Sequence, residues 1–194
     1  METTFSILET QIIDRLHDVD YYESIYINKA LAQILDSYDI PQEAKLACLT
    51  IDTAMRHLDE VTTSLSSKKS ILIGDLLSAH FYTILAKLND PVYQQLISSA
   101  IVTVNEMKSS IHQGVVSDDK LDEYILKVEN TFPLITINHF ASVSNQTEIN
   151  ATLLKNITEH HPAYLKHYSN EKLNSFSNQV NIEIHLKRGN EHGR

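Results

Sequence analysis

Apolar residues recur every three or four positions along most of this chain, and that spacing is typical of amphipathic helices. Residues that interrupt helices are rare. The 194 residues include four glycines and four prolines, well below the ordinary usage of about 7% glycine and about 5% proline. Folds made of short strands need these residues for their tight turns. The sequence therefore predicts an all-α fold, a bundle of mostly antiparallel helices.

Two apolar stripes open the chain, and each predicts a helix. The first stripe consists of Phe5, Leu8, Ile12, Leu16 and Val19, and the second of Tyr22, Ile25, Ala30, Ile34 and Tyr38. A third helix is expected to begin near Pro41, because proline is well tolerated in the first turn of a helix. The serine-rich segment SLSSKKS at residues 64–70 breaks the periodicity and predicts a connection.

The second half of the chain continues in the same way. A strong helical pattern begins at Gly74 and should end before Pro91, and the next should run to Gly114. Ser117 is a suitable cap for the helix that follows, with acidic residues in its first turn. Pro133 is expected to interrupt that helix, because proline lacks the amide hydrogen that the interior of a helix needs.

The composition changes near residue 143. Beyond it the chain is rich in Asn, Ser and His, and weaker helices are expected near 147–159 and 170–186. The sequence therefore predicts a helical core domain at residues 1–143. It also predicts a weaker helical extension at 144–194 with a frayed, charged end.

Charge and cysteine content limit the partners. Sixteen basic and 25 acidic residues give a net charge of −9, which disfavours nucleic acid as a partner. Cys48 is the single cysteine, so it has no internal disulfide partner, and no thiolate metal site can be built around it. This pattern fits a reducing compartment, and a cytoplasmic location without a membrane-spanning segment is expected.

Three segments between about residues 45 and 135 resemble the trans-isoprenyl diphosphate synthases. Residues 50–61 resemble the helix that leads to the first Asp-rich motif of those enzymes, residues 74–78 their Gly-Asp helix start, and residues 122–131 their diphosphate-binding stretch. The match to the first motif, Asp59-Glu60-Val61-Thr62-Thr63, lacks its last carboxylate, and Thr131 stands where the diphosphate-binding lysine is expected. The glycine- and arginine-rich run that precedes the first motif in the family is missing, since residues 21–40 contain neither residue type.

A more specific resemblance comes from Gly-Asp-Leu-Leu-Ser followed about thirty residues later by Asn-Glu-x-Lys, in a short acidic chain. This pattern is similar to component I of heptaprenyl diphosphate synthase, the small noncatalytic subunit of a heteromeric enzyme. The positions that carry the motif are Gly74, Asp75, Ser78, Asn105, Glu106 and Lys108.

The resemblance implies a degenerate isoprenyl-synthase-like fold and a role as a regulatory subunit. The partner would be a catalytic polyprenyl synthase subunit that holds Mg²⁺ and makes heptaprenyl diphosphate, the menaquinone side chain, from farnesyl and isopentenyl diphosphates. It also implies an influence on product length and leaves contact with the polyprenyl product open. No catalytic residue, metal ligand or cofactor is assigned to this chain.

Ordinary structural roles compete with these assignments. Gly74 could simply allow close helix packing and Asp75 could be a helix cap. Of Asn105, Glu106 and Lys108, which lie within one turn, two should be solvated. The residues that could line a prenyl chain or an interface are Leu76, Leu77, Phe81, Ile84 and Leu85, but a stripe of this spacing is more often core.

The run Asp118-Asp119-Lys120-Leu121-Asp122 spells the DDxxD motif. It lies too early for the second Asp-rich motif of the family and at an expected helix start, so a capping role is favoured over a magnesium site. His57 and the adjacent His160 and His161 lack metal-ligand spacing, and Cys48 within an apolar helix has no nucleophilic context. Two other hypotheses remain open: a helical adaptor that binds no prenyl ligand, and an autonomous prenyltransferase that uses Asp59, Glu60 and the 118–122 run.

Overall fold

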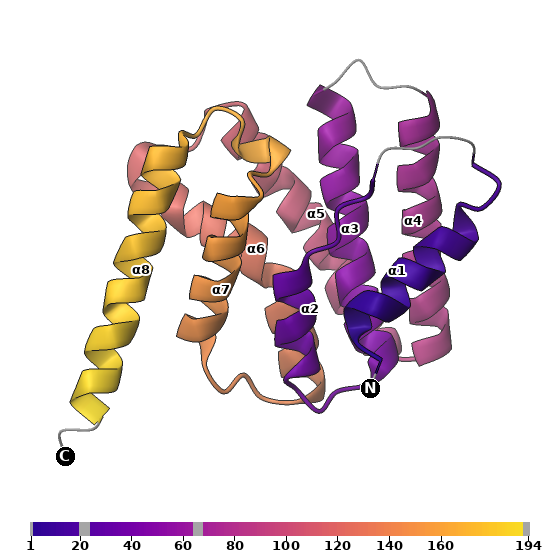
Figure 1. Ribbon diagram of the computed structural model, residues 1–194, viewed down its shortest axis with the longest axis horizontal. Helices are drawn as coiled ribbons and strands as arrows, with labels where there is room; N and C mark the ends of the chain where they lie inside the picture. The colour runs from indigo at the N-terminus through magenta and orange to yellow at the C-terminus, as the bar shows by residue number, and fades with distance from the viewer. Residues whose placement is uncertain (1, 20–23, 64–67, 192–194) are drawn as a thin grey trace. The chain divides into compact units, whose positions relative to one another are not determined.

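The computed structural model describes residues 2–19, 24–63 and 68–191, with backbone alone at 61–63 and 183–191. Within these ranges the chain forms helices and no strand, which confirms the predicted all-α class. The helices are α1 (Thr4–Arg15), α2 (Lys29–Asp36), α3 (Gln42–Thr63), α4 (Lys68–Leu88), α5 (Pro91–His112), α6 (Asp118–Phe140), α7 (Gln146–Glu159), the short 3-10 helix η1 (Ala163–Leu165) and α8 (Asn170–Glu191) (Figure 1).

The chain divides into two compact units. The first contains residues 1–101 and 132–142, and the second contains 102–131 and 143–194. Helices α5 and α6 therefore each contribute one part to the first unit and one part to the second. The sequence boundary at residue 143 falls where the chain passes from the first unit to the second, and the division into a core domain and a weaker extension stays a prediction.

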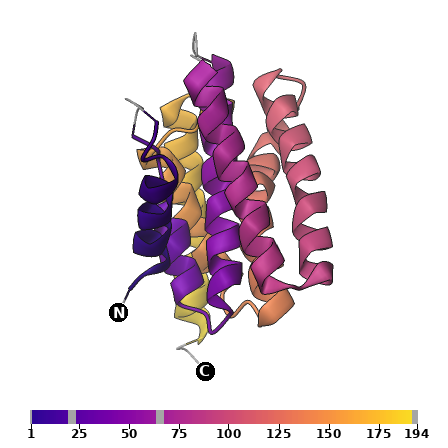
Figure 2. The ribbon, with the colours of Figure 1, turned by 90° about the vertical axis from the view of Figure 1, so that its right-hand side faces the viewer.

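The first unit is built around α3 and α4, which run side by side (Figures 1 and 2). Both carry one largely apolar face, because apolar residues recur at helical spacing on each. A Cβ atom placed on Gly74 of α4 would lie 2.7 Å from Cγ of Leu58 on α3. Gly74 therefore permits the close approach of α3 and α4, which is the structural role that the sequence analysis considered for it.

Helices α1 and α2 pack on α3. The backbone amide of Thr4, at the start of α1, donates a hydrogen bond of 3.1 Å to the carboxylate of Asp36, at the end of α2. Asn28 caps α2 by accepting from the amide of Leu31 at 3.0 Å. A partly buried polar contact joins α1 to α4, where His80 Nε2 lies 2.8 Å from Gln11 Oε1.

The start of α5 and the end of α6 complete the first unit. Asp90 accepts a hydrogen bond from the amide of Tyr93 at 2.9 Å, and His139 of α6 lies 2.8 Å from the same carboxylate. The hydroxyl groups of buried Tyr93 and Thr136 are 2.8 Å apart. The predicted boundary between α4 and α5 is therefore correct, and an aspartate cap fixes it.

The second unit contains the end of α5, the start of α6, and α7, η1 and α8. Helices α7 and α8 pack against each other and bury an apolar face. Its buried residues are Ile149, Leu153, Leu154 and Ile157 from α7 and Leu173, Phe176 and Val180 from α8. The weaker helices predicted near 147–159 and 170–186 are confirmed, and α8 extends to Glu191.

Two predicted helix starts are wrong. The second apolar stripe does not form one helix, because residues 24–28 are not helical and α2 begins at Lys29 behind its Asn28 cap; Tyr22 lies outside the described residues. The helix expected from Gly74 begins at Lys68, so the predicted connection is restricted to residues 64–67, outside the described ranges.

Pro133 was expected to interrupt α6, but the helix continues to Phe140. Residues on both sides of the proline are buried, including Phe132, Thr136 and Ile137. An interior proline costs about 3 kcal/mol or more. Burying several large side chains on the same helix face offsets that cost, since each contributes about 1.5–3 kcal/mol.

Helix α4 is long and apolar enough to cross a membrane, by length and composition only. The sequence analysis expected no such stretch. Ile73, Leu77, Phe81 and Leu85 of α4 are buried in the first unit, and α4 packs along α3. This packing is typical of a core helix.

Candidate functional site

The Gly-Asp-Leu-Leu-Ser segment lies in the interior of α4, two turns after its start. Gly74 is buried against Leu58. Asp75 is exposed, and the interpretation of Asp75 as a helix cap is wrong because the helix begins six residues before Gly74. Ser78 donates its hydroxyl hydrogen back to the carbonyl of Gly74 at 2.9 Å, which is a local helix contact.

The residues proposed to line a prenyl chain are mostly core. Leu77, Phe81, Ile84 and Leu85 have exposed fractions of 4% or less in the first unit, and Leu76 is half-buried. This burial agrees with the interpretation of the stripe as part of the hydrophobic core. A role in lining an elongation passage stays a prediction.

The opposite face of α4 is apolar as well. Ile71, Leu72 and Tyr82 are about half exposed, with fractions of 48%, 50% and 50%. Between residues 71 and 86 this outward arc also carries Ala79, Thr83 and Ala86, and Asp75 is the one charged residue in it. Exposed helix faces normally carry many charges, and a helix that is hydrophobic all round is usually buried. Sequence periodicity missed this face, because it marked only the side that packs on α3.

The second motif group, at the end of α5, separates into two environments. Asn105 and Glu106 are exposed, whereas Lys108 is only 8% exposed, so the expectation that two of the three are solvated is confirmed. The Lys108 ammonium lies 5.5 Å from the ring centre of Tyr164, and the Tyr164 hydroxyl donates a buried 2.7 Å hydrogen bond to Glu129. Lys108 therefore contributes to a buried polar cluster that joins α5 and α6 to η1.

The two acidic runs differ in position. Asp59 and Glu60 lie near the end of α3, and the side chains of residues 61–63 are outside the described part. Asp118 and Asp119 occupy the first turn of α6, as the capping interpretation expects, and Asp122 accepts a 3.0 Å hydrogen bond from Tyr168. No group of three or more potential metal-ligating side chains occurs among the residues that were searched, which are the described ones.

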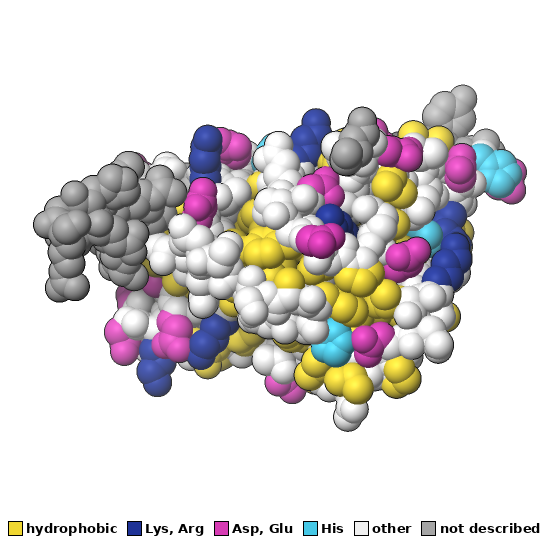
Figure 3. Space-filling model, turned by 90° about the horizontal axis from the view of Figure 1, so that it is seen from below, with side chains coloured by type: hydrophobic (Ala, Val, Ile, Leu, Met, Phe, Trp, Pro, Cys, Tyr) yellow, Lys and Arg dark blue, Asp and Glu magenta, His cyan; other side chains and the backbone are white. Residues whose placement is uncertain are grey.

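Acidic side chains occur at several places on the face of the molecule shown in Figure 3, some of them beside one another and beside Lys or Arg, and apolar side chains reach the surface between these places. The negative charge of the chain repels polyanions.

Cys48 is fully buried in α3, and burial raises the pKa of its thiol to about 12. A thiol with so high a pKa is protonated at neutral pH, so Cys48 does not act as a nucleophile. His57 contacts the carbonyl oxygen of Ser70 at 3.0 Å and His161 contacts that of Tyr168 at 3.1 Å. Both histidines serve local packing.

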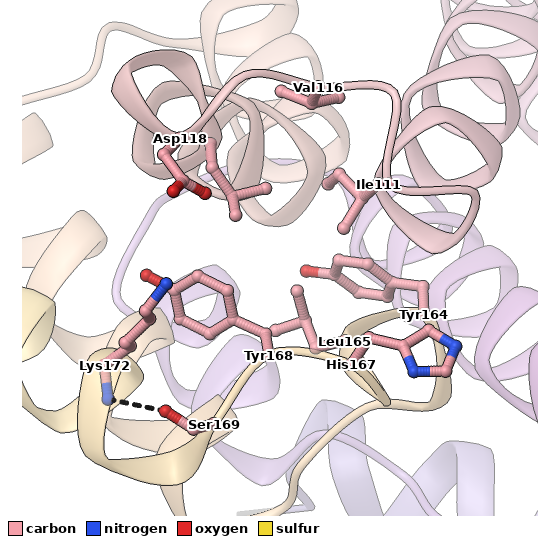
Figure 4. Close-up of a pocket in the computed structure, with 11 residues that line it drawn as sticks. Ile111, Val116, Asp118, Tyr164, Leu165, His167, Tyr168, Ser169 and Lys172 are labelled. Atoms are coloured by element: carbon pink, nitrogen blue, oxygen red, sulfur yellow. Dashed lines mark hydrogen bonds between the residues drawn. The ribbon is translucent and has the colours of Figure 1, made fainter.

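A pocket in the second unit was not predicted from the sequence (Figure 4). Its volume is about 260 Å³. One side comes from the loop between α5 and α6 and the start of α6, and the other from η1 and the start of α8. The residues that shape it are Ile111, Asp118, Leu121, Tyr164, Tyr168 and Lys172. Burial and the neighbouring Asp122 carboxylate raise the pKa of Tyr168 well above its ordinary value.

Comparison with known proteins places this chain in a family. A family model described as HexPS-like, the small subunit of hexaprenyl diphosphate synthase, matches residues 2–135. The chain belongs to this small-subunit family. The degenerate motifs at Asp59, Gly74 and Lys108 all fall within the matched segment.

A solved structure extends the similarity. The crystal structure of heptaprenyl diphosphate synthase from Staphylococcus aureus contains a chain that is 47% identical, and the match covers 91% of the present chain and 96% of the other, with a TM-score of 0.79. The isoprenyl-synthase-like fold class and the family resemblance are thus both confirmed for this small subunit. The family model ends at residue 135, so α7, η1 and α8 lie beyond it.

Proposed function

We propose that this small subunit binds a catalytic polyprenyl diphosphate synthase subunit through the outward face of α4 and supports elongation there without performing chemistry itself. The observation that carries this proposal is the apolar character of α4 on both sides, in a member of a small-subunit family. The face made by Ile71, Leu72 and Tyr82 exposes large apolar side chains that a partner subunit would cover.

The chemistry of the reaction supports a division of labour. Ionisation of an allylic diphosphate needs magnesium ions and cationic side chains that stabilise the leaving diphosphate. In this chain the position of the last motif carboxylate is Thr63, and that of the diphosphate-binding lysine is Thr131. The catalytic partner would therefore supply Mg²⁺ and both carboxylate clusters, and this subunit would bind no cofactor.

Asp75 has a specific role in this proposal. It lies in the middle of the outward arc of α4 and is exposed. A carboxylate covered by a partner needs a cation or several donors, because burying an unpaired charge is costly. We therefore expect Asp75 to contact a lysine or arginine of the catalytic subunit.

The product would be a long-chain all-trans polyprenyl diphosphate made from farnesyl and isopentenyl diphosphates. The family description names a hexaprenyl enzyme and the similar crystal structure a heptaprenyl enzyme. We expect the product to be heptaprenyl diphosphate, made in the cytoplasm as the precursor of the menaquinone side chain. Mass spectrometry of the extracted lipid would identify it.

The test uses co-expression with the catalytic subunit, followed by affinity co-purification and an elongation assay with Mg²⁺ and both substrates. The chain alone should give no elongation, and the pair should give turnover. Leu72→Glu and Tyr82→Glu should each abolish co-purification, because a charge would be placed in an apolar interface.

Ile13→Glu on α1 is the matched control, because Ile13 is a similarly exposed apolar residue, at 56%, on another helix. It should leave co-purification and turnover unchanged. Elongation by the purified chain alone would contradict the noncatalytic role. Normal assembly of Leu72→Glu and Tyr82→Glu with full turnover would contradict the α4 interface, and assembly without any effect on prenyl products would favour the adaptor hypothesis.

A further inference from the structure

The pocket of the second unit presents opposite charges on opposite walls (Figure 4). Asp118 enters from the start of α6 and Lys172 from the first turn of α8, and their charged ends point toward each other across the cavity. Both side chains are exposed, and neither forms an ion pair with any residue in the described part of the chain. The Lys172 ammonium lies 6.0 Å from the centre of the Tyr168 ring. Two complementary charges that face each other without meeting leave space for a ligand that contacts both.

The two tyrosines add acceptors. The Tyr164 hydroxyl donates to Glu129 at 2.7 Å, and the Tyr168 hydroxyl donates to Asp122 at 3.0 Å. Because each phenol hydrogen is already used, each phenol oxygen has only lone pairs to offer to a ligand. Together with the Asp118 carboxylate they form an acceptor-rich lining, which favours an ammonium group.

The apolar part and the size of the cavity restrict the ligand further. Ile111, Leu121 and Leu165 line the same pocket and would contact a hydrocarbon or aromatic side chain. The volume of about 260 Å³ is below the range of about 300–1,000 Å³ that is typical of drug-sized ligands. A ligand about as large as one amino acid fits this space.

We infer that this pocket binds a small zwitterion, an α-amino acid with an apolar or aromatic side chain. Its ammonium group contacts the carboxylate of Asp118, its carboxylate contacts the ammonium of Lys172, and its side chain lies against Ile111 and Leu121. The inference is independent of the proposed function, because the pocket belongs to the second unit and the outward face of α4 belongs to the first.

The test is a titration of the full ¹⁵N-labelled chain with L-phenylalanine, L-tyrosine and L-leucine, followed by NMR. We expect saturable shifts of the amides near residues 118 and 164–172, with a dissociation constant on the order of 1 mM. Phenethylamine lacks the carboxylate and 3-phenylpropionate lacks the ammonium group. Each should bind at least about tenfold more weakly than L-phenylalanine, because each leaves one charged contact unmade.

Variants separate this site from general charge effects. Asp118→Asn and Lys172→Gln should each weaken binding about tenfold or more, and Lys172→Arg should keep most of it. The matched controls Asp119→Asn and Lys166→Gln change exposed neighbours that do not line the pocket and should have no effect. An unchanged amide spectrum for each variant would verify its fold.

Three results would overturn the inference: no saturable shift with any of the three amino acids, equal binding of either single-charge analogue, or binding that survives both Asp118→Asn and Lys172→Gln. The charges of Asp118 and Lys172 would then have no ligand-binding role.

Discussion

Gly74 shows how one residue type can decide the packing of two helices. A methyl group at this position would meet Cγ of Leu58 at 2.7 Å, and Cγ is a branch point that cannot move without the whole side chain. Replacing glycine by alanine inside a helix normally stabilises it by about 1 kcal/mol. Overpacking costs about 1–3 kcal/mol, so the clash should outweigh the gain in helix propensity.

We therefore expect Gly74→Ala to lower the free energy of unfolding, measured by urea titration. The double variant Gly74→Ala with Leu58→Ala should lose less free energy of unfolding than the two single variants lose together, because the smaller side chain at position 58 leaves room for the methyl group. Additive effects in this double-mutant cycle would show that the two residues do not compete for space.

His80 gives the first unit a dependence on pH. Burial, together with the charges of Arg15 and Lys87, lowers the pKa of its imidazole from 6.5 to about 4. The unfolded chain therefore binds a proton at this residue at a higher pH than the folded chain does. Stability is kept above pH 6.5 and is lost as the pH falls from 6.5 toward 4.

The variant His80→Gln removes this titration while retaining a polar side chain opposite Gln11. Urea titrations across the same pH window should show a steeper loss of stability for the original chain than for the variant. Equal slopes would mean that other groups, such as carboxylates, account for the whole dependence.

At the scale of elements, η1 is attached to α5 and α6 through Tyr164. Its hydroxyl group donates to the buried Glu129 carboxylate, and its ring lies under the Lys108 ammonium. Tyr164→Phe would remove one donor from a buried carboxylate, at a cost of about 1–3 kcal/mol. We expect faster hydrogen exchange in α7 and α8.

Tyr168→Phe is the matched control, since it removes the same atom from a half-buried side chain whose partner Asp122 is also only half-buried. Water can replace the lost bond there, so exchange should change little. If both variants behaved alike, the buried cluster of Lys108, Glu129 and Tyr164 would have no special part in holding η1.

Phe81 tests the function of the inner face of α4. It is fully buried, so Phe81→Ala should cost about 3–5 kcal/mol by opening a cavity. We expect lowered thermal stability of the assembled enzyme and an unchanged product length. Longer products with a nearly normal melting temperature would instead show that Phe81 faces the growing prenyl chain.

At the scale of the whole molecule, helices with strong local signals were predictable. Pro91 and the Asp90 cap mark the start of α5, and Gly114, with φ of +67°, follows the end of the same helix. The passage of α6 through Pro133 was not predictable, because tertiary packing, which a single sequence does not display, overrides a local preference. The start of α2 was missed although its Asn28 cap is a local signal.

The candidate sites were predictable to different degrees. The family relationship could be seen from Gly74, Asp75 and Lys108, because order and spacing survive in the sequence even where the carboxylates are lost. The outward face of α4 and the pocket could not be seen. Each depends on which side of a helix meets another element, and Asp118 and Lys172 are more than fifty residues apart.

The interleaved arrangement of the two units has a consequence for biosynthesis on the ribosome. The first unit needs residues 132–142, since Thr136 supplies the hydroxyl partner of buried Tyr93. Domains that are continuous in sequence can complete their folding as soon as they emerge from the exit tunnel. Here neither unit is continuous, so the nascent chain must hold α3 and α4 partly uncovered until most of α6 has emerged. During that interval the outward face of α4 is open to water, and a chaperone or the catalytic subunit itself would meet this chain before its core has closed.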